Sequence, residues 1–331
     1  MIIEERAYAR AGLLGNPSDG YFGKTISVSV KNFGARVSLY ESPELRIELP
    51  TDDSHEFPNV HTMIERIRQH GYYGADRLIK AAIKRFVLYC EENDVNLENK
   101  NFTIRYHSNI PRQVGLAGSS AIITATFRAL MRFYNIQIPK KILPTLILNT
   151  ETQELGINAG LQDRVIQVYE GCVYMDFEQN YLLENHYGRY KELNPSLLSN
   201  LYIAYKTELS KISGVVLNDI RSRYEKGEKL VIDTLNEIAG CAGEGYKILK
   251  SGQTEGLHEL INRNFDLRSK IMNISESNMQ MVETARVCGA SAKFAGSGGS
   301  IIGLYHNNEM LTRLIVEMKK INARVIRPYI S

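Results

Sequence analysis

Pro-Arg-Gln-Val-Gly-Leu-Ala-Gly-Ser-Ser-Ala, residues Pro111 to Ala121, is the stretch on which the interpretation of the whole chain depends. Alternating side chains predict a strand over Phe102–His107 before it, and apolar spacing predicts a helix over Ala121–Tyr134 after it. Glycines let a backbone approach a ligand closely, and a helix N-terminus presents unpaired N–H groups to an anion. The stretch therefore fits a phosphate-binding loop, and a serine-capped structural turn is an equally open alternative at this point.

Composition excludes several classes of partner. The chain has 331 residues and a formal net charge of +3, and its acidic and basic residues are interleaved, which leaves no electrostatic footprint for nucleic acid. No apolar run reaches membrane-spanning length, and the first residues show no signal-like apolar region. The four cysteines are widely spaced, which argues against zinc ligation and suits a reducing compartment. We therefore predict a cytoplasmic protein without nucleic-acid or membrane partners.

The order of the predicted elements indicates two α+β domains. Two alternating runs, Ile26–Val30 and Ala35–Tyr40, flank Asn32-Phe33-Gly34, which predicts a β-hairpin. The polar stretch 178–196 predicts a boundary, so we assign one domain to residues 1–185 and a second to residues 186–331. The other predicted strands are Arg46–Leu49, Cys172–Phe177, Leu201–Tyr205, Ser291–Phe294, Ser300–Tyr305 and Ala323–Arg327, and the other helices are Ala75–Glu92, Lys140–Asn149, Leu161–Tyr169, several within 213–287, and Met310–Ile321.

A second glycine-rich turn, Ala295-Gly296-Ser297-Gly298-Gly299, lies between two predicted strands of the C-terminal half. Gly23-Lys24-Thr25, by contrast, is not a P-loop, because Ser18 stands where that motif needs glycine and an alternating run follows instead of a helix. No G-x-G-x-x-G pattern follows a strand, so a dinucleotide-binding fold is not indicated.

Three motifs, in order along the chain, resemble those of the GHMP kinases, the galactokinase, homoserine, mevalonate and phosphomevalonate kinase superfamily. The first is Arg10-Ala-Gly-Leu-Leu-Gly-Asn-Pro-Ser-Asp-Gly-Tyr-Phe-Gly23, the second is Pro111–Ala121, and the third is Lys293-Phe-Ala-Gly-Ser-Gly-Gly299. The resemblance covers most of the chain. It implies an N-terminal ribosomal-protein-S5-like domain and a C-terminal ferredoxin-like α/β domain, with the active site between them.

The resemblance also implies a role for individual residues. Asp163 matches the catalytic base, Arg10 the basic residue beside the reacting hydroxyl, and Asp19 the carboxylate that bonds sugar hydroxyls. Glu151 matches the acidic residue near a magnesium ion, and Ser120 matches the serine that reaches the ion, with Ser119 as a second candidate. The residues implied to contact the phosphates of ATP are Pro111, Gly115, Leu116, Ala117, Gly118, Ser119, Ser120, Ala121, Gly296, Ser297 and Gly298.

These implied roles agree with the chemistry of phosphoryl transfer, which needs positioning, charge neutralisation and a base near the attacking hydroxyl. Mg²⁺ takes oxygen ligands and keeps several waters, so one carboxylate and one hydroxyl suffice. A guanidinium from Arg10 or Arg164 would keep Asp163 ionised. Without the resemblance, Asp163 would be read as an ordinary acid at a helix N-terminus.

Within the superfamily, stretches such as Ala9–Asp19 and Gly160-Leu-Gln-Asp-Arg164 are similar to plant-type glucuronokinases, which implies ATP-dependent phosphorylation of the anomeric hydroxyl of D-glucuronate. The chain departs from the family at Asn16-Pro17, where Glu or Gly-Glu-His is usual, which leaves open which hydroxyls are recognised. The carboxylate of a uronic acid needs a cation, and Lys24, Arg112 and Arg164 are the candidates.

Two alternatives remain open from the sequence. One is a GHMP kinase for another sugar or sugar phosphate, such as galacturonate, a hexose or a heptose phosphate. The other is a catalytically silent relative that binds ligand and acts as a regulator. The sequence leaves the oligomeric state open between monomer and homodimer.

Overall fold

The structure is a computed structural model, and it describes residues 2–48, 55–64, 76–206 and 214–331. The chain divides into two compact units that are interleaved along the sequence. Unit 1 comprises Met1–Ala9, Phe33–Ile110 and Gly118–Val168, and unit 2 comprises Arg10–Asn32, Pro111–Ala117 and Tyr169–Ser331. Two long strands, β1 (Ile2–Leu14) and β2 (Lys24–Glu41), contribute residues to both units. The predicted domain boundary at residues 185 and 186 is a different division of the chain and stays a prediction.

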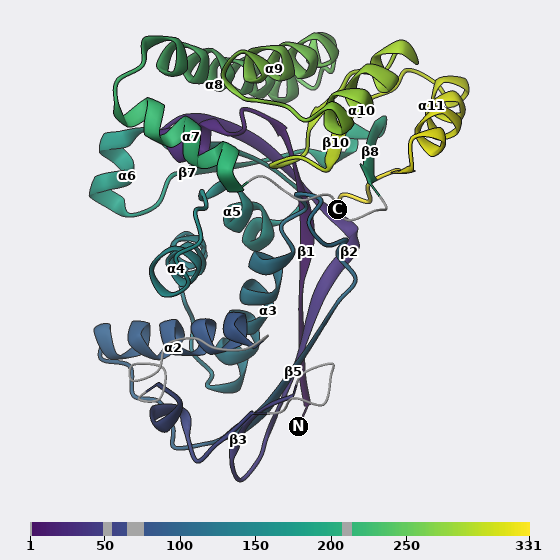
Figure 1. The fold of residues 1–331 in the computed structure, drawn as a ribbon. Helices are drawn as coiled ribbons and strands as arrows, with labels where there is room; N and C mark the ends of the chain where they lie inside the picture. The colour runs from purple at the N-terminus through teal and green to yellow at the C-terminus, as the bar shows by residue number, and fades with distance from the viewer. Residues whose placement is uncertain (1, 49–54, 65–75, 207–213) are drawn as a thin grey trace. The chain divides into compact units, whose positions relative to one another are not determined.

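Unit 1 consists of strands covered by helices. The second half of β2 pairs antiparallel with β5 (Phe102–Ser108), which pairs in parallel with β3 (Leu45–Glu48), and β3 pairs with β4 (His55–Phe57). Figure 1 shows helices on one face of these strands, and they pack on one another. These helices are α2 (Arg77–Glu92), α3 (Gly118–Phe133) and α4 (Leu143–Asn149). Phe86 of α2 and Phe127 of α3 meet edge to face, with ring centroids 6.2 Å apart.

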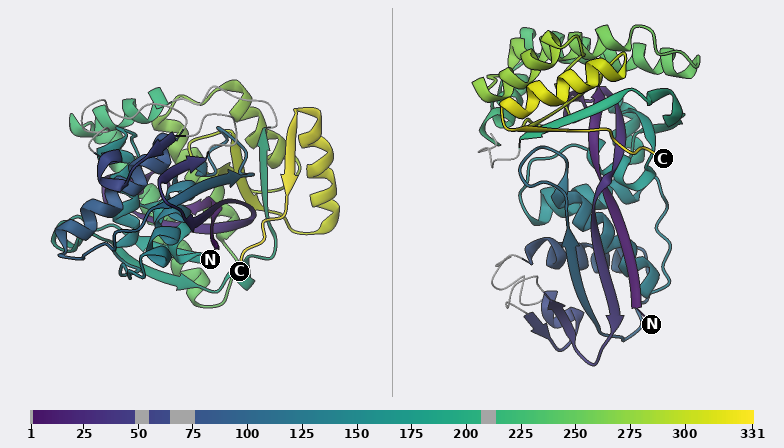
Figure 2. Two further views of the ribbon diagram at one scale, coloured as in Figure 1. Left: turned by 90° about the horizontal axis from the view of Figure 1, so that it is seen from below. Right: turned by 90° about the vertical axis from the view of Figure 1, so that its right-hand side faces the viewer.

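Unit 2 contains an antiparallel four-stranded sheet with the order β11-β8-β10-β9. Its strands are β8 (Leu201–Lys206), β9 (Lys293–Phe294), β10 (Ser300–Leu304) and β11 (Ala323–Ile326). Its helices are α7 (Gly214–Glu225), α8 (Lys229–Lys250), α9 (Leu257–Ile271), α10 (Glu276–Val287) and α11 (Asn308–Lys320). Figure 2 shows α11 beside β11, both in yellow. A buried core that includes Tyr202, Phe265 and Leu314 joins this sheet to α9, α10 and α11.

The first half of β2 also lies in unit 2. There it pairs with β6 (Cys172–Asp176), which pairs with β7 (Arg189–Leu193). Helix α6 (Gln179–Asn185) connects β6 to β7. The polar stretch 178–196, predicted as a boundary, therefore contains a helix and a strand.

The prediction of a hairpin at Asn32-Phe33-Gly34 is wrong, because β2 runs without interruption from Lys24 to Glu41. The Asn32 amide donates to the carbonyl of Arg327 at 3.1 Å and accepts from the N–H of Tyr329 at 2.8 Å. Gly34 lies close to β1, since a Cβ on it would be 3.1 Å from the carbonyl oxygen of Ala7. Asn32 and Gly34 therefore make contacts with neighbouring segments and do not reverse the chain direction.

Most other predicted elements are confirmed to within a few residues of their ends, among them the strand at 102–107 and the helices at 75–92 and 310–321. β1 was not predicted. Its buried positions include Ala7, Ala9 and Ala11, and alanine gives only a weak strand signal.

Candidate active site

The glycine-rich stretch has the predicted strand–turn–helix arrangement, because β5 ends at Ser108 before it and α3 begins at Gly118 after it. The helix begins three residues earlier than predicted, so Ser119 and Ser120 lie in its first turn. The first four residues of a helix carry N–H groups without an intrahelical acceptor, and the helix dipole favours an anion at this end. The side chain of Ser119 is exposed here, whereas Ser120 is buried.

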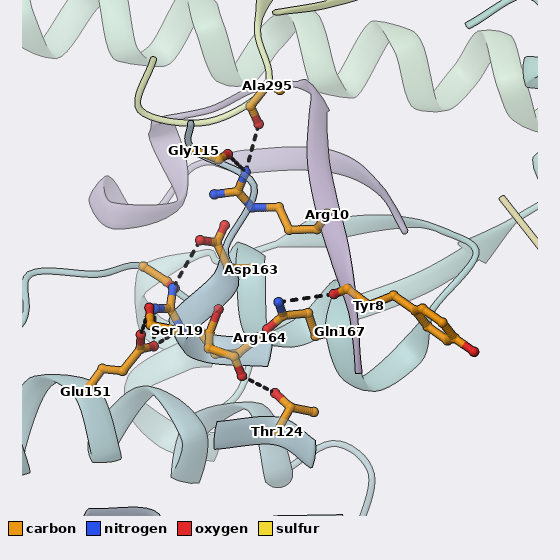
Figure 3. Close-up of polar contacts among 12 residues, drawn as sticks. Tyr8, Arg10, Gly115, Ser119, Thr124, Glu151, Asp163, Arg164, Gln167 and Ala295 are labelled. Carbon is orange, nitrogen blue, oxygen red and sulfur yellow. Dashed lines mark hydrogen bonds and ion pairs between the residues drawn. The ribbon is translucent and has the colours of Figure 1, made fainter. Parts of the chain in front are cut away.

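Gly115 permits a close approach between the second and third motifs, both of which lie in unit 2 at this point. Its φ of +71° is left-handed, and a Cβ on it would lie 2.7 Å from the carbonyl oxygen of Gly298. The carbonyl of Gly115 accepts a 2.6 Å hydrogen bond from Nη1 of Arg10, which also donates to the carbonyl of Ala295 at 3.0 Å (Figure 3). Arg10 therefore bonds both glycine turns.

The same bonds fix the direction of the backbone N–H groups in these turns. The Gly296 carbonyl accepts from Nη1 of Arg268 at 2.9 Å, as the Gly115 carbonyl accepts from the guanidinium just described. Because C=O and N–H point in opposite directions in a trans peptide, the N–H groups of Leu116 and Ser297 point away from these cations. Neither N–H has an acceptor within the described ranges. Unpaired backbone donors on adjacent glycine turns suit an anion such as a phosphate.

We expect Gly115→Ala to raise the KM for ATP by about tenfold or more, because the new methyl group would push the two glycine turns apart. Gly252→Ala is the matched control, since Gly252 has a similar φ of +78° but no heavy atom within 4 Å of an added Cβ. Both variants suffer the backbone strain of about 1–2 kcal/mol, and only the first suffers the clash. Steady-state kinetics and melting temperatures compare them. Equal KM values for ATP in the two variants would show that close approach at Gly115 is not needed for ATP binding.

Glu151 lies in unit 1, in a π-helical turn, Thr150–Glu154, that follows α4 directly. An ion pair between Lys84 of α2 and Glu154 links this turn to α2. A single wide turn has no periodic pattern, so the sequence gives no signal for it. Such turns frequently occur at functional sites, where they redirect a side chain.

The Glu151 side chain is fully buried and bonded through both oxygens. Oγ of Ser119 donates to Oε1 at 3.1 Å, and Nε of Arg164 donates to Oε2 at 2.6 Å, with Nη2 on the same oxygen (Figure 3). Arg164 belongs to α5 (Gln162–Tyr169), and its Nη1 lies 3.4 Å from Oδ2 of Asp163. One network in unit 1 therefore joins Ser119, Glu151, Arg164 and Asp163. The side chain of Asp163 is 20% exposed, so a substrate can reach it.

This network refines two expectations. The hydroxyl that bonds Glu151 belongs to Ser119, whereas the carbonyl of Ser120 accepts from Oγ1 of Thr124 at 2.7 Å. Arg164 is buried, and it donates to Glu151 and to the carbonyl of Gly160 at 2.8 Å. These contacts favour a role in holding the carboxylates, and its predicted contact with substrate stays a prediction.

The remaining predicted substrate residues lie in unit 2. Asp19 is in a short 3₁₀ turn, Ser18–Tyr21, and Lys24 begins β2 with its ammonium 3.9 Å from Asp176. The side chain of Lys24 is 44% exposed, and Arg112 is exposed as well.

Two buried cations near the first motif had no predicted role. Nζ of Lys293 donates to the carbonyl of Gly12 at 2.7 Å and also bonds the side chain of Asn16. Arg268 comes from α9. Lys293 lies in the third motif and so could have been singled out, but Arg268 lies within an ordinary helical pattern that gives no signal.

No group of three or more His, Cys, Asp or Glu side chains in the described ranges is arranged to hold a metal ion. No helix in these ranges is long and apolar enough to cross a membrane.

Comparisons with known proteins agree with the three motifs. The family model for the GHMP kinases N terminal domain matches residues 77–171. Probable glucuronokinase 2 from Arabidopsis thaliana is 42% identical over 334 residues, which cover 99% of this chain and 91% of the relative. This protein belongs to the GHMP kinase family. Glucuronokinase 1 from the same plant is also 42% identical, over 91% of this GHMP kinase and 84% of its own length.

The fold of this GHMP kinase has counterparts among solved structures. The galactokinase of Lactococcus lactis, solved with galactose, has a TM-score of 0.83 and covers 99% of this chain and 93% of its own, at 15% identity. At that identity the likeness concerns the fold alone. It confirms the predicted two-domain α+β GHMP fold, and the Arabidopsis relatives confirm the resemblance to plant-type glucuronokinases.

Proposed function

We propose that this GHMP kinase is an ATP-dependent glucuronokinase. It transfers the γ-phosphoryl group of ATP to the anomeric hydroxyl of D-glucuronate and releases D-glucuronate 1-phosphate and ADP. The observation that carries the proposal is the 42% identity to two glucuronokinases, which extends over at least 91% of this chain.

Asp163 is the base in this proposal. Its carboxylate accepts the proton of the anomeric hydroxyl, whose oxygen bonds to the γ-phosphorus. The bond to the β–γ bridging oxygen breaks, and ADP leaves with that electron pair. The guanidinium of Arg164, 3.4 Å from Asp163, supports this role because it favours the ionised carboxylate before the proton is transferred.

Ser119 and Glu151 are the proposed holders of Mg²⁺, with Ser120 as the alternative serine. Their side-chain oxygens lie 3.1 Å apart and are the hard donors that Mg²⁺ prefers. Bound there, the ion would neutralise negative charge on the phosphates of ATP. The N–H groups of Leu116 and Ser297 and of the first turn of α3 are the proposed phosphate donors, with Arg10 holding the loops that carry them.

A substrate panel tests the proposal. ADP release is measured with glucuronate, galacturonate, glucose and a heptose phosphate, with and without Mg²⁺, and ³¹P NMR identifies the phosphorylated position. We expect the highest kcat/KM for glucuronate, an anomeric phosphate and a requirement for Mg²⁺. Faster turnover of a neutral hexose or a heptose phosphate would favour the alternative sugar kinase. ADP release with none of the sugars would favour the silent relative. A cytoplasmic location and a monomeric or homodimeric state stay predictions.

A further inference from the structure

Three cations are buried in unit 2 at the first and third motifs: Arg10, whose contacts are described above, Lys293 and Arg268. Lys293 and Arg268 are each 1% exposed. A buried charge is costly unless an opposite charge or a set of hydrogen bonds compensates it. Among the described residues no carboxylate forms an ion pair with Lys293 or Arg268. Each cation must therefore be compensated in another way.

Lys293 is compensated by oxygen atoms of the protein. Its Nζ donates to the carbonyls of Gly12 at 2.7 Å and Phe294 at 2.8 Å, and to the side-chain oxygen of Asn16. Burial lowers the pKa of Lys293, and so do Arg268 and Arg10 nearby. Three oxygen acceptors nevertheless use all three protons of an ammonium, so they retain the charged form. Lys293 is thus a fixed positive charge whose donors are all in use.

Arg268 is compensated less completely. A guanidinium has five N–H donors. Within the described ranges its acceptors are the carbonyl of Gly296 at 2.9 Å and the sulfur of Met272 at 2.9 Å, which is a weak acceptor. Its guanidinium also lies over the ring of Phe294, 5.2 Å from the centroid. Burial lowers the pKa of Arg268 to about 10, and the negative charge of Asp19 acts in the opposite direction. Arg268 therefore has N–H donors that the protein does not use, and its charge interacts with that of Asp19.

Helix α9 places this cation next to the first motif. Asn264, one turn before Arg268, accepts from the N–H of Gly15 at 2.7 Å and its amide lies 3.5 Å from the carbonyl of Asn16. Asn16 precedes the short turn Ser18–Tyr21, which contains Asp19, the carboxylate expected to bond the sugar. Three buried cations, Arg10, Arg268 and Lys293, and the one carboxylate of Asp19 leave an excess of positive charge there. A ligand with a carboxylate would balance it, and a neutral ligand would not.

We propose that Arg268, supported by the fixed charge of Lys293, is the residue that selects a sugar with a carboxylate over a neutral sugar. The proposal rests on the proposed function, and it replaces Lys24, Arg112 and Arg164 as the expected cation for the uronate. Arg268 donates to the substrate carboxylate, while Lys293 adds to the positive potential without a direct bond.

The test compares glucuronate with glucose, which differs from it only at C6. In Arg268→Met we expect the ratio of kcat/KM for glucuronate to kcat/KM for glucose to fall about 100-fold. The KM for ATP should rise equally with both sugars, because the bond to the Gly296 carbonyl is lost as well. Arg286→Met is the matched control. Arg286 likewise lies over a phenylalanine ring, 5.3 Å from Phe265, and donates to a backbone carbonyl, but it belongs to α10. The ratio of the two kcat/KM values should be unchanged in that control.

Equal losses with both sugars in Arg268→Met would show a purely structural role and overturn the proposal, as would an unchanged ratio. If Arg268→Met does not fold, Arg268→Lys is tested in its place, because one ammonium cannot form two parallel bonds to a carboxylate. The ratio of kcat/KM for glucuronate to kcat/KM for glucose should fall about tenfold in Arg268→Lys, and a wild-type ratio would overturn the proposal. The wild-type panel separately tests the proposed function: if glucuronate is not turned over there, that function fails whatever the variants do.

Discussion

Asp163→Asn should lower kcat by about 10²- to 10⁴-fold, while the KM for ATP stays within about threefold of the wild-type value. The amide keeps the shape of the carboxylate but cannot take the proton of the anomeric hydroxyl. The contacts around Glu151 do not depend on the charge of Asp163, since Ser119 and Arg164 bond Glu151 directly. We therefore expect a loss of chemistry with little loss of structure.

Steady-state kinetics and a melting curve for the same preparation separate these effects. Asp219→Asn serves as the control, because this carboxylate of α7 is 61% exposed and only pairs with Arg223. It should retain wild-type kinetics. Turnover close to wild type in Asp163→Asn would remove Asp163 from the role of base.

Arg164→Met should lower the free energy of unfolding by about 3–5 kcal/mol, because it leaves the fully buried carboxylate of Glu151 without its cation. Activity should fall with it, since Arg164 also bonds the backbone at Gly160 and pairs with Asp163. Chemical denaturation gives the free energy. The matched control is Arg223→Met, which breaks a similar two-bond pair with Glu228 whose side chains are 27% and 39% exposed. That loss should be at most about 1 kcal/mol.

The double variant Glu151→Met/Arg164→Met separates stability from chemistry. Two apolar side chains remove both buried charges, so most of the lost stability should return. Activity should not return, because Glu151 is a proposed holder of Mg²⁺. A double variant as unstable as the sum of the two single variants would contradict the description of the pair as mutually compensating.

Local patterns explain why the glycine loop could be predicted. The strand before it, the helix after it and the glycines between them can each be recognised from about ten residues of sequence. All three are present in the structure, as β5, the turn and α3. The roles of Asp163 and Glu151 came only from the family resemblance. Nothing in the local pattern distinguishes Asp163 from an ordinary helix N-terminal acid.

Contacts between distant segments explain what could not be predicted. Asn32 and Gly34 have the composition of a turn, but their partners near Tyr329 and Ala7 keep β2 extended. Arg268 lies within an ordinary helical pattern that gives no signal, and in the structure it is buried against Gly296 and Phe294 of the third motif. In both cases a tertiary partner overrides the local tendency, and one sequence alone does not reveal that partner.

The interleaving of the two units constrains how such an enzyme can change. The chain passes from one unit to the other after residues 9, 32, 110, 117 and 168. A single cut in the polypeptide therefore yields fragments that carry pieces of the other unit or lack pieces of their own. A gene fusion with one crossover cannot exchange a whole unit for that of a related kinase. Substrate preference in this architecture is therefore more easily changed by substitutions of individual side chains. Arg268 is one position at which a single substitution would change it.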